Sequence, residues 1–261
     1  MKAFQKLRKL PSFLRSLIAI LFWVGVWWLV ALIYQKPALL PTPWRVLVRL
    51  VSLLKTGAFY GAVGTSLLHI LIGLVCGCAV GILVGILVAL SRVSDTLLTP
   101  AFSVVRATPV VCFIIIAWLF VGTRALPSFI SALMVAPVVM TSTAAAIRSV
   151  DPRLIEAARV YHLTVPKKIR ALYLPSTLPQ IRASLVTCVG LAWKSGIAAE
   201  VIALPKNSIG YEIWYEKSWQ LDFEAVFAWT VTVVIFSLVL EKLVKLALAY
   251  RKGDRHASPS E

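Results

Sequence analysis

The fold is decided by residues 62–90, which read AVGTSLLHILIGLVCGCAVGILVGILVAL and contain no Asp, Glu, Lys or Arg. A helix of about 20 predominantly apolar residues can cross a bilayer, because every backbone polar group is paired within the segment. A run of this length therefore predicts a membrane-spanning helix. The whole chain has the same character, with 59% hydrophobic residues, 15% charged residues and a mean hydropathy of +0.86. This composition excludes an ordinary soluble domain.

Glycine recurs at every fourth residue of this stretch, at Gly73, Gly77, Gly81 and Gly85. Residues without a side chain let a second helix approach closely, and helix packing in membranes depends on such van der Waals contact. We expect these glycines to pack against another helix of the same chain. A seam between two subunits is the alternative.

Five further stretches have the length and composition of membrane spans. The six expected spans are roughly 14–34, 62–90, 100–121, 127–147, 177–203 and 225–248. Pro109 and Pro137 fall inside the third and fourth spans, where neighbouring helices are expected to tolerate them as kinks. The sequence thus predicts an all-α integral membrane domain over residues 14–250, with tails at 1–13 and 251–261.

Basic residues are distributed unequally between the two sides that these spans define. Most of the 27 Lys and Arg residues fall on the side of the N-terminus. The positive-inside rule then predicts six crossings with both termini in the cytoplasm. Basic residues that orient the chain in a membrane also explain the net charge of +16. We therefore expect no nucleic-acid partner.

The longest polar segment on the cytoplasmic side is residues 148–175. Asp151-Pro152 predicts a helix N-cap followed by proline in the first turn. A break near residues 161–163 then gives a helix-turn-helix that is expected to close at Leu174-Pro175. Such a segment is suited to contact with a soluble partner.

The first helix of this segment carries a small apolar face. Leu154, Ile155 and Ala158 are expected to form it, with Glu156 and Arg159 on its flanks. Small residues on such a face let a partner helix or groove come close.

Residues 156–175 resemble the EAA loop of ABC importer permeases, in which Glu-Ala-Ala is followed after three residues by Gly and nine residues later by Ile-x-Leu-Pro. The chain has Glu156-Ala157-Ala158 and, at the matching distance, Leu172-Tyr-Leu-Pro175. His162 stands at the glycine position. A side chain in a turn of positive φ costs about 1–2 kcal/mol, although His tolerates that region better than most residues. We hypothesise that His162 keeps the turn and adds a contact to an ATPase subunit.

The resemblance extends along most of the chain. In particular, the chain is similar to the nitrate, sulfonate and taurine permeases. The segments that carry it are Leu40-Pro-Thr-Pro43, Arg106-Ala-Thr-Pro109, Val150-Asp-Pro-Arg-Leu-Ile-Glu-Ala-Ala-Arg159 and Ala192-Trp-Lys-Ser-Gly-Ile-Ala-Ala-Glu200.

This resemblance implies a type I ABC importer permease fold with a cytoplasmic coupling helix, in a bacterial inner membrane. The implied partners are two cytoplasmic ATPase subunits, an extracytoplasmic solute-binding protein, and a second permease copy or a paralogue. The implied coupling residues are Asp151, Leu154, Ile155, Glu156, Ala157, Ala158, Arg159, His162, Leu174 and Pro175. ATP and Mg would be used by the partner ATPase, not by this chain.

The solute implied by the subfamily is a small anion such as a sulfonate or nitrate. An importer of a vitamin precursor such as a pyrimidine is an alternative. An ATP-independent secondary transporter or channel is the competing class, although the halves of the chain show no internal repeat of the kind expected there.

Three ionisable residues fall within or near the ends of the expected spans, where such groups usually face protein or water. Lys194 lies nearest mid-membrane and is the best candidate to meet an anionic solute, with a buried structural ion pair as the alternative. Glu200 is six residues further on and on a different face, so direct pairing with Lys194 is not expected. Arg106 is expected near the inner end of its span. His69 is expected to be packed and hydrogen-bonded.

No catalytic or metal-binding set is evident in the sequence. The four cysteines lie inside apolar runs without His or carboxylate at metal-ligand spacing. Residues 190–195 contain Lys-Ser but lack the second glycine of a phosphate-binding loop. We therefore expect no metal site and no enzyme activity in this chain, with ATP hydrolysis in a separate subunit.

Overall fold

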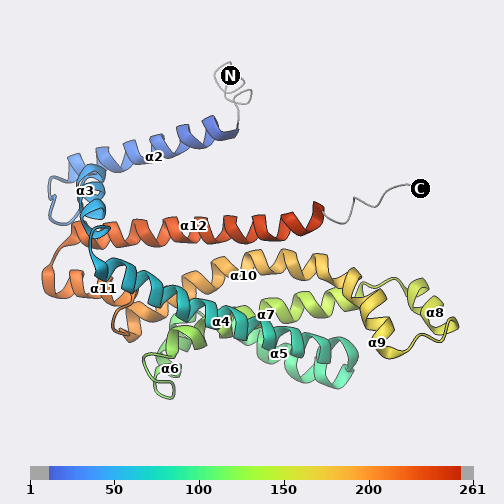
Figure 1. The fold of residues 1–261 in the computed structure, drawn as a ribbon. Helices are drawn as coiled ribbons and strands as arrows, with labels where there is room; N and C mark the ends of the chain where they lie inside the picture. Colours follow the sequence, from blue (N-terminus) through green and yellow to red (C-terminus); the bar gives the residue numbers. More distant parts are fainter. Residues whose placement is uncertain (1–11, 254–261) are drawn as a thin grey trace. The chain divides into compact units, whose positions relative to one another are not determined.

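The computed structural model describes residues 12–253, and this part of the chain is helical without strands (Figure 1). The α-helices are α2 (Ser12–Tyr34), α3 (Pro43–Leu53), α4 (Gly57–Leu90), α5 (Arg92–Ala107), α6 (Val110–Trp118), α7 (Leu126–Arg148), α8 (Pro152–Val160), α9 (Val165–Lys168), α10 (Leu174–Ala203), α11 (Ile209–Tyr215) and α12 (Phe223–Gly253). Two π-helical turns, η1 (Ile169–Tyr173) and η2 (Glu216–Gln220), precede α10 and α12. The all-α prediction is confirmed. The expected tails lie outside the described residues except where α2 and α12 enter them.

Five helices in the described part are long and apolar enough to cross a membrane, and the number is six if the pair α5 and α6 counts as one span. The chain is thus a multi-pass membrane protein. The third expected span is not the single helix of residues 100–121. This part of the chain forms two helices, α5, which begins at Arg92, and α6, which is turned by 103° from α5.

The break between α5 and α6 has a local cause. Pro109 disfavours helical backbone at the preceding residue and cannot donate a hydrogen bond to the preceding turn. Thr108 accordingly has extended angles, with φ −87° and ψ 137°. Pro137, by contrast, lies inside the continuous helix α7.

The fifth span also differs from the expected one. Residues 165–203 run as one continuous helical stretch that contains an apolar window long enough to span, so the helix does not close at Leu174-Pro175. The amide of Leu174 donates to the carbonyl of Ile169, which is the wider bonding pattern of a π-turn. Because this turn re-routes the hydrogen bonds next to Pro175, the helix passes through the proline instead of ending there.

The chain divides into two compact units. The first comprises the described residues up to 60 together with 213–232. Within it, Arg49 of α3 forms an ion pair of 2.9 Å with Asp222, and the rings of Phe59 and Trp229 stack at 5.1 Å. These contacts join segments that are far apart in the sequence.

The second unit comprises residues 61–212 together with the described residues from 233 onward. Its centre is the pair α7 and α10, and α4 packs against α7 through the four regularly spaced glycines. A Cβ added at Gly77 or Gly81 would lie 2.7 Å from a backbone oxygen of α7. The structure thus places all four glycines against a helix of the same chain.

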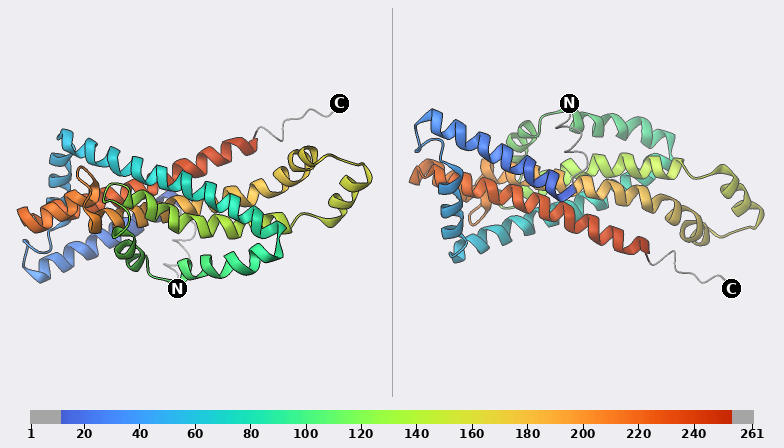
Figure 2. Two further views of the ribbon diagram at one scale, coloured as in Figure 1. Left: turned by 90° about the horizontal axis from the view of Figure 1, so that it is seen from below. Right: turned by 90° about the horizontal axis from the view of Figure 1, so that it is seen from above.

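Helices α8 and α9 lie together at one end of α7 and α10, whereas α6 lies at the other end (Figures 1 and 2). Arg148, the last residue of α7, fixes the end that carries α8. Its guanidinium donates to the carbonyl of Val88 and to Asp95, both at 2.8 Å. The ends of α4, α5 and α7 are joined at this point.

Candidate functional site

The segment formed by α8, the turn after it, α9 and η1 is called the elbow below. The side chain of Asp151 accepts a hydrogen bond of 2.8 Å from the amide of Arg153, and Pro152 occupies the first helical position. Both features satisfy the start of α8 as expected from the sequence.

The turn after α8 is a Schellman motif centred on His162. The amide of His162 donates to the carbonyl of Arg159, and the amide of Leu163 donates to the carbonyl of Ala158, both at 3.0 Å. This pattern requires a left-handed residue, for which glycine is the usual choice. His162 adopts it with φ 48°, so the histidine occupies the glycine conformation.

The elbow has its own apolar core. Val150, Ala158 and Leu172 are buried together, and Ile155 and Leu163 pack against them. Leu163 packs against the cluster that contains Ala158, and an apolar contact of this kind often accompanies a Schellman turn. A core of this kind makes the elbow a packed unit with a fixed angle.

This packing corrects the predicted apolar face of α8. Ala158 is buried in the elbow core and Ile155 is partly buried against it, so neither forms the exposed face that was expected. The reason is that the second half of the elbow folds back and covers them. Leu154 lies on the outer side instead, with half of its surface exposed.

The outer surface of the elbow carries large apolar side chains beside charged ones. Val160 is 69% exposed and Tyr161 is 78% exposed, although neither was singled out from the sequence. Their position next to the break in the helix was the available signal. The other predicted coupling residues that are exposed are Asp151, Glu156, Ala157, Arg159, His162, Leu174 and Pro175.

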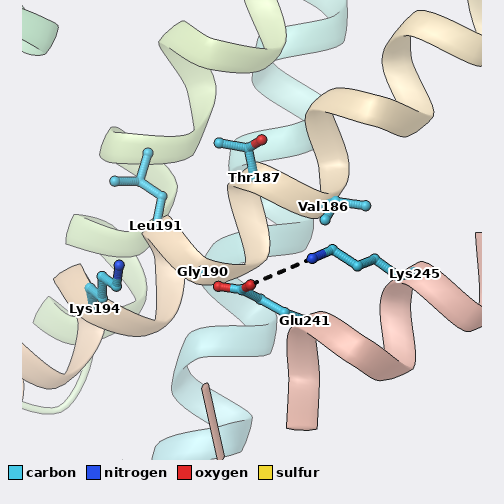
Figure 3. A pocket seen from close by; sticks show the side chains of 7 residues that line it. All are labelled: Val186, Thr187, Gly190, Leu191, Lys194, Glu241 and Lys245. Atoms are coloured by element: carbon cyan, nitrogen blue, oxygen red, sulfur yellow. Dashed lines mark ion pairs between the residues drawn. The ribbon is translucent and has the colours of Figure 1, made fainter. Parts of the chain in front are cut away.

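A second group of candidate residues lies between α10 and α12. Lys194 lines a pocket of about 380 Å³ together with Glu241 and Lys245 of α12 (Figure 3). The ammonium of Lys245 lies 3.9 Å from the carboxylate of Glu241, and both residues belong to α12. Lys194 extends from α10, one turn after Gly190 (Figure 3). Lys194 is nine residues before Ala203, so it lies about 14 Å along α10 from that end.

Glu200 is fully buried and is held by groups from α4 and from the start of α11. Ser66 donates to it at 2.7 Å, and the amide of Gly210 donates to the same oxygen at 3.2 Å. Nδ1 of His69 lies 3.3 Å from the other oxygen. His69 is thus hydrogen-bonded as expected, and no ion pair between Glu200 and Lys194 is found in residues 12–253.

Arg106 is not near the elbow end of its helix. It lies in the last turn of α5, beside the bend, and about 21 Å along the helix from Arg92. The expected position was wrong because α5 begins earlier than the predicted span. The structure does not bring Arg106 together with Lys194 or Glu200 in any contact among the described residues.

Comparison with known proteins identifies the chain. Residues 81–248 match the family model described as binding-protein-dependent transport system inner membrane component. The chain belongs to this family. It is therefore a permease component of ABC importers, a transport subunit and not an enzyme.

Two curated relatives and one solved structure illustrate this membership. The permease is 30% identical over 240 residues to a probable ABC transporter permease protein of Brucella melitensis, covering 89% of this chain and 93% of the relative. It is 28% identical over 224 residues to the taurine transport system permease protein TauC of Escherichia coli K12, covering 83% and 80%. A bacterial ABC transporter involved in the import of the acidic polysaccharide alginate has the same fold, with a TM-score of 0.64, 17% identity and coverage of 95% and 98%.

Among residues 12–253 of the permease, no group of three or more His, Cys, Asp or Glu side chains is placed to hold a metal ion.

Proposed function

We propose that this permease imports a small anion and that the elbow receives the force of a separate cytoplasmic ATPase pair. A solute-binding protein would deliver the anion from outside, and the permease would act as a homodimer or with a paralogue. Both termini and the elbow would then lie in the cytoplasm, with ATP and Mg bound only by the ATPase subunits.

The packing and the exposed surface of the elbow support this proposal. It is a packed unit at one end of α7 and α10, yet it presents Leu154, Val160 and Tyr161 to solvent. Exposed large apolar side chains on a packed segment of this kind are typical of a protein interaction surface. Since the elbow continues into α10 without a break in the helix, a push on the elbow reaches the membrane bundle directly.

The charge of the elbow supports its cytoplasmic location. Arg153, Arg159, Lys167, Lys168 and Arg170 all belong to this short segment. An excess of basic residues in a short loop favours the cytoplasmic side.

The anionic nature of the solute rests on two observations. TauC is named for taurine, which carries a sulfonate. Lys194 is exposed on α10 within the span, where a cation is stable only beside water, protein or a counter-charge. We propose that Lys194 meets the anion during its passage.

Docking of the ATPase is tested by co-purification with the tagged permease. Tyr161→Asp places a charge on the outer elbow surface without touching the elbow core, so we expect the ATPase to be lost. Trp219→Asp is the matched control, because Trp219 is 70% exposed but lies far from the elbow in the sequence. Retention of the ATPase by Tyr161→Asp would contradict the docking surface.

The role of Lys194 is tested by uptake of a labelled sulfonate. Lys194→Met keeps a long unbranched side chain and removes the charge, so we expect a higher apparent Km at unchanged ATPase co-purification. Uptake with unchanged apparent Km would remove Lys194 from the solute path.

A further inference from the structure

A second pocket lies at the end of the second unit that is distant from the elbow, and it is called the distal pocket below. Its volume is about 440 Å³. Three segments line it, namely α4, the loop between α6 and α7, and the loop between α10 and α11. The lining residues are Thr65, His69, Thr123, Arg124, Pro205, Lys206 and Asn207.

The lining of the distal pocket is rich in donors and contains two cations. Arg124 and Lys206 come from different loops, and neither forms an ion pair with a carboxylate within the described residues. No Asp or Glu lines the pocket. The pocket beside Lys194 differs, since Glu241 lines it and pairs with Lys245. The distal pocket therefore has the composition expected for binding an anion.

The loop that carries Lys206 is held in one conformation. Its two ends are left-handed residues, with φ 55° at Leu204 and φ 58° at Asn207. The hydroxyl of Ser208 donates to the carbonyl of Pro205 at 2.8 Å, and the amide of Ile209 donates to the hydroxyl of Ser66 at 2.9 Å. Binding of a ligand by Lys206 therefore does not have to order the backbone of this loop.

Glu200 is the anchor of this arrangement. The amide of Leu204 donates to its backbone carbonyl at 2.9 Å, and the amide of Gly210 donates to its carboxylate, so one residue ties both sides of the loop. Its negative charge is already shared among Ser66, Gly210 and His69.

We propose that the distal pocket binds a small oxyanion, of the size of sulfate or a short sulfonate, between Arg124 and Lys206. Thr65, Thr123 and Asn207 supply further donors, and Ser66 and Glu200 are positioning residues that fix the loop of Lys206. The proposal rests on the import of an anion and adds the place where the permease first holds it, on the side away from the ATPase. The volume lies at the small end of the range for ligand pockets, which suits a small solute.

The test uses the full-length chain in dodecyl maltoside and trifluoromethanesulfonate as the probe. Binding broadens the fluorine resonance of this small sulfonate, and titration gives its affinity. We expect Arg124→Gln with Lys206→Gln to weaken the affinity at least about tenfold, because two charged contacts are lost. Arg124→Lys with Lys206→Arg keeps both charges and is expected to retain binding.

The matched control is Lys36→Gln with Lys55→Gln, which removes two exposed cations that do not line the pocket. Equal broadening by the wild type and by Arg124→Gln with Lys206→Gln would overturn the proposal. This assay involves neither ATPase nor transport. A negative result for anion binding in the distal pocket is thus distinguished from a negative result for ATPase docking, which co-purification measures independently.

A lipid phosphate has the same chemistry as the free anion, and a second arm distinguishes the two. The titration is repeated in nanodiscs of phosphatidylglycerol, where we expect the affinity for the probe to be unchanged. Loss of the broadening in this lipid would assign the distal pocket to a headgroup and overturn the role of a free solute.

Discussion

Replacement of Gly77 by alanine tests the close packing of α4 on α7. The added Cβ would lie 2.7 Å from the carbonyl oxygen of Ala132 and 2.9 Å from its Cα. Ordinary contacts of a Cβ begin at 3.4 Å, so the helices must separate locally by about 0.7 Å, the difference between 3.4 and 2.7 Å. Since the opposing atoms belong to the backbone of α7, no side-chain rotation relieves the overlap. Overpacking of this kind costs about 1–3 kcal/mol.

Gly64→Ala is the control on the same helix, because a Cβ at Gly64 meets nothing within 4 Å. The gain in helix propensity from alanine is common to both variants and cancels in the comparison. We therefore expect Gly77→Ala to be less stable than Gly64→Ala by about 1–3 kcal/mol. For a chain of this size the difference corresponds to about 2–12 °C in Tm, measured by thermal unfolding in dodecyl maltoside. Equal Tm values for the two variants would refute the proposed backbone contact.

Three further predictions concern single side chains. His162→Val places a β-branched residue at φ 48° and is expected to destabilise the elbow by about 1–2 kcal/mol more than His162→Asn, seen as faster amide exchange of Leu163; equal exchange would contradict the strained turn. Glu200→Gln keeps the shape of the side chain but weakens its hydrogen bonds to Ser66 and Gly210. The free energy of opening measured by hydrogen exchange at the amides of Ile209 and Gly210 should therefore fall by about 1–3 kcal/mol. Glu241→Gln should leave the exchange of these amides unchanged. Burial raises the pKa of Glu216 above its usual 4.5, although Arg49 opposes the shift, so the folded state binds this proton more tightly than the unfolded state. The stability that this proton contributes is therefore lost as pH rises through the raised pKa. Glu216→Gln should abolish that part of the fall in Tm, and a variant with the same pH profile of Tm as the wild type would refute the role of Glu216.

Four of the long apolar helices, α2, α4, α7 and α12, and the start of the elbow were predictable from sequence because they depend on local properties. Apolar length alone identifies a helix such as α4, and Asp151-Pro152 specifies the beginning of α8 through its own hydrogen bonding. The left-handed turn at His162 was also accessible, since the spacing placed this residue where glycine is usual.

Other features depend on contacts that no local pattern contains. Ala158 and Ile155 are turned inward because Leu172 returns to cover them, and Leu172 belongs to a later helical segment. The partners of Glu200 include Ser66, which is 134 residues away in the sequence. The bend at Thr108 had a visible cause in Pro109, but the same residue type at position 137 leaves α7 unbroken. Proline alone therefore does not indicate the size of a bend.

The distal pocket illustrates the same limit. Arg124 and Lys206 are separated by two membrane helices in the sequence, and each alone is an ordinary loop cation. Only the packing of α4 and α7 with α10 brings their loops to one cavity.

We propose that the elbow is the surface on which the ATPase acts. A photo-crosslinking amino acid at position 161, compared with the same amino acid at position 219, tests it in the assembled transporter within its membrane. We predict a crosslink from position 161 to the ATPase and none from position 219. An ATPase crosslink at position 219 with none at position 161 would contradict the account.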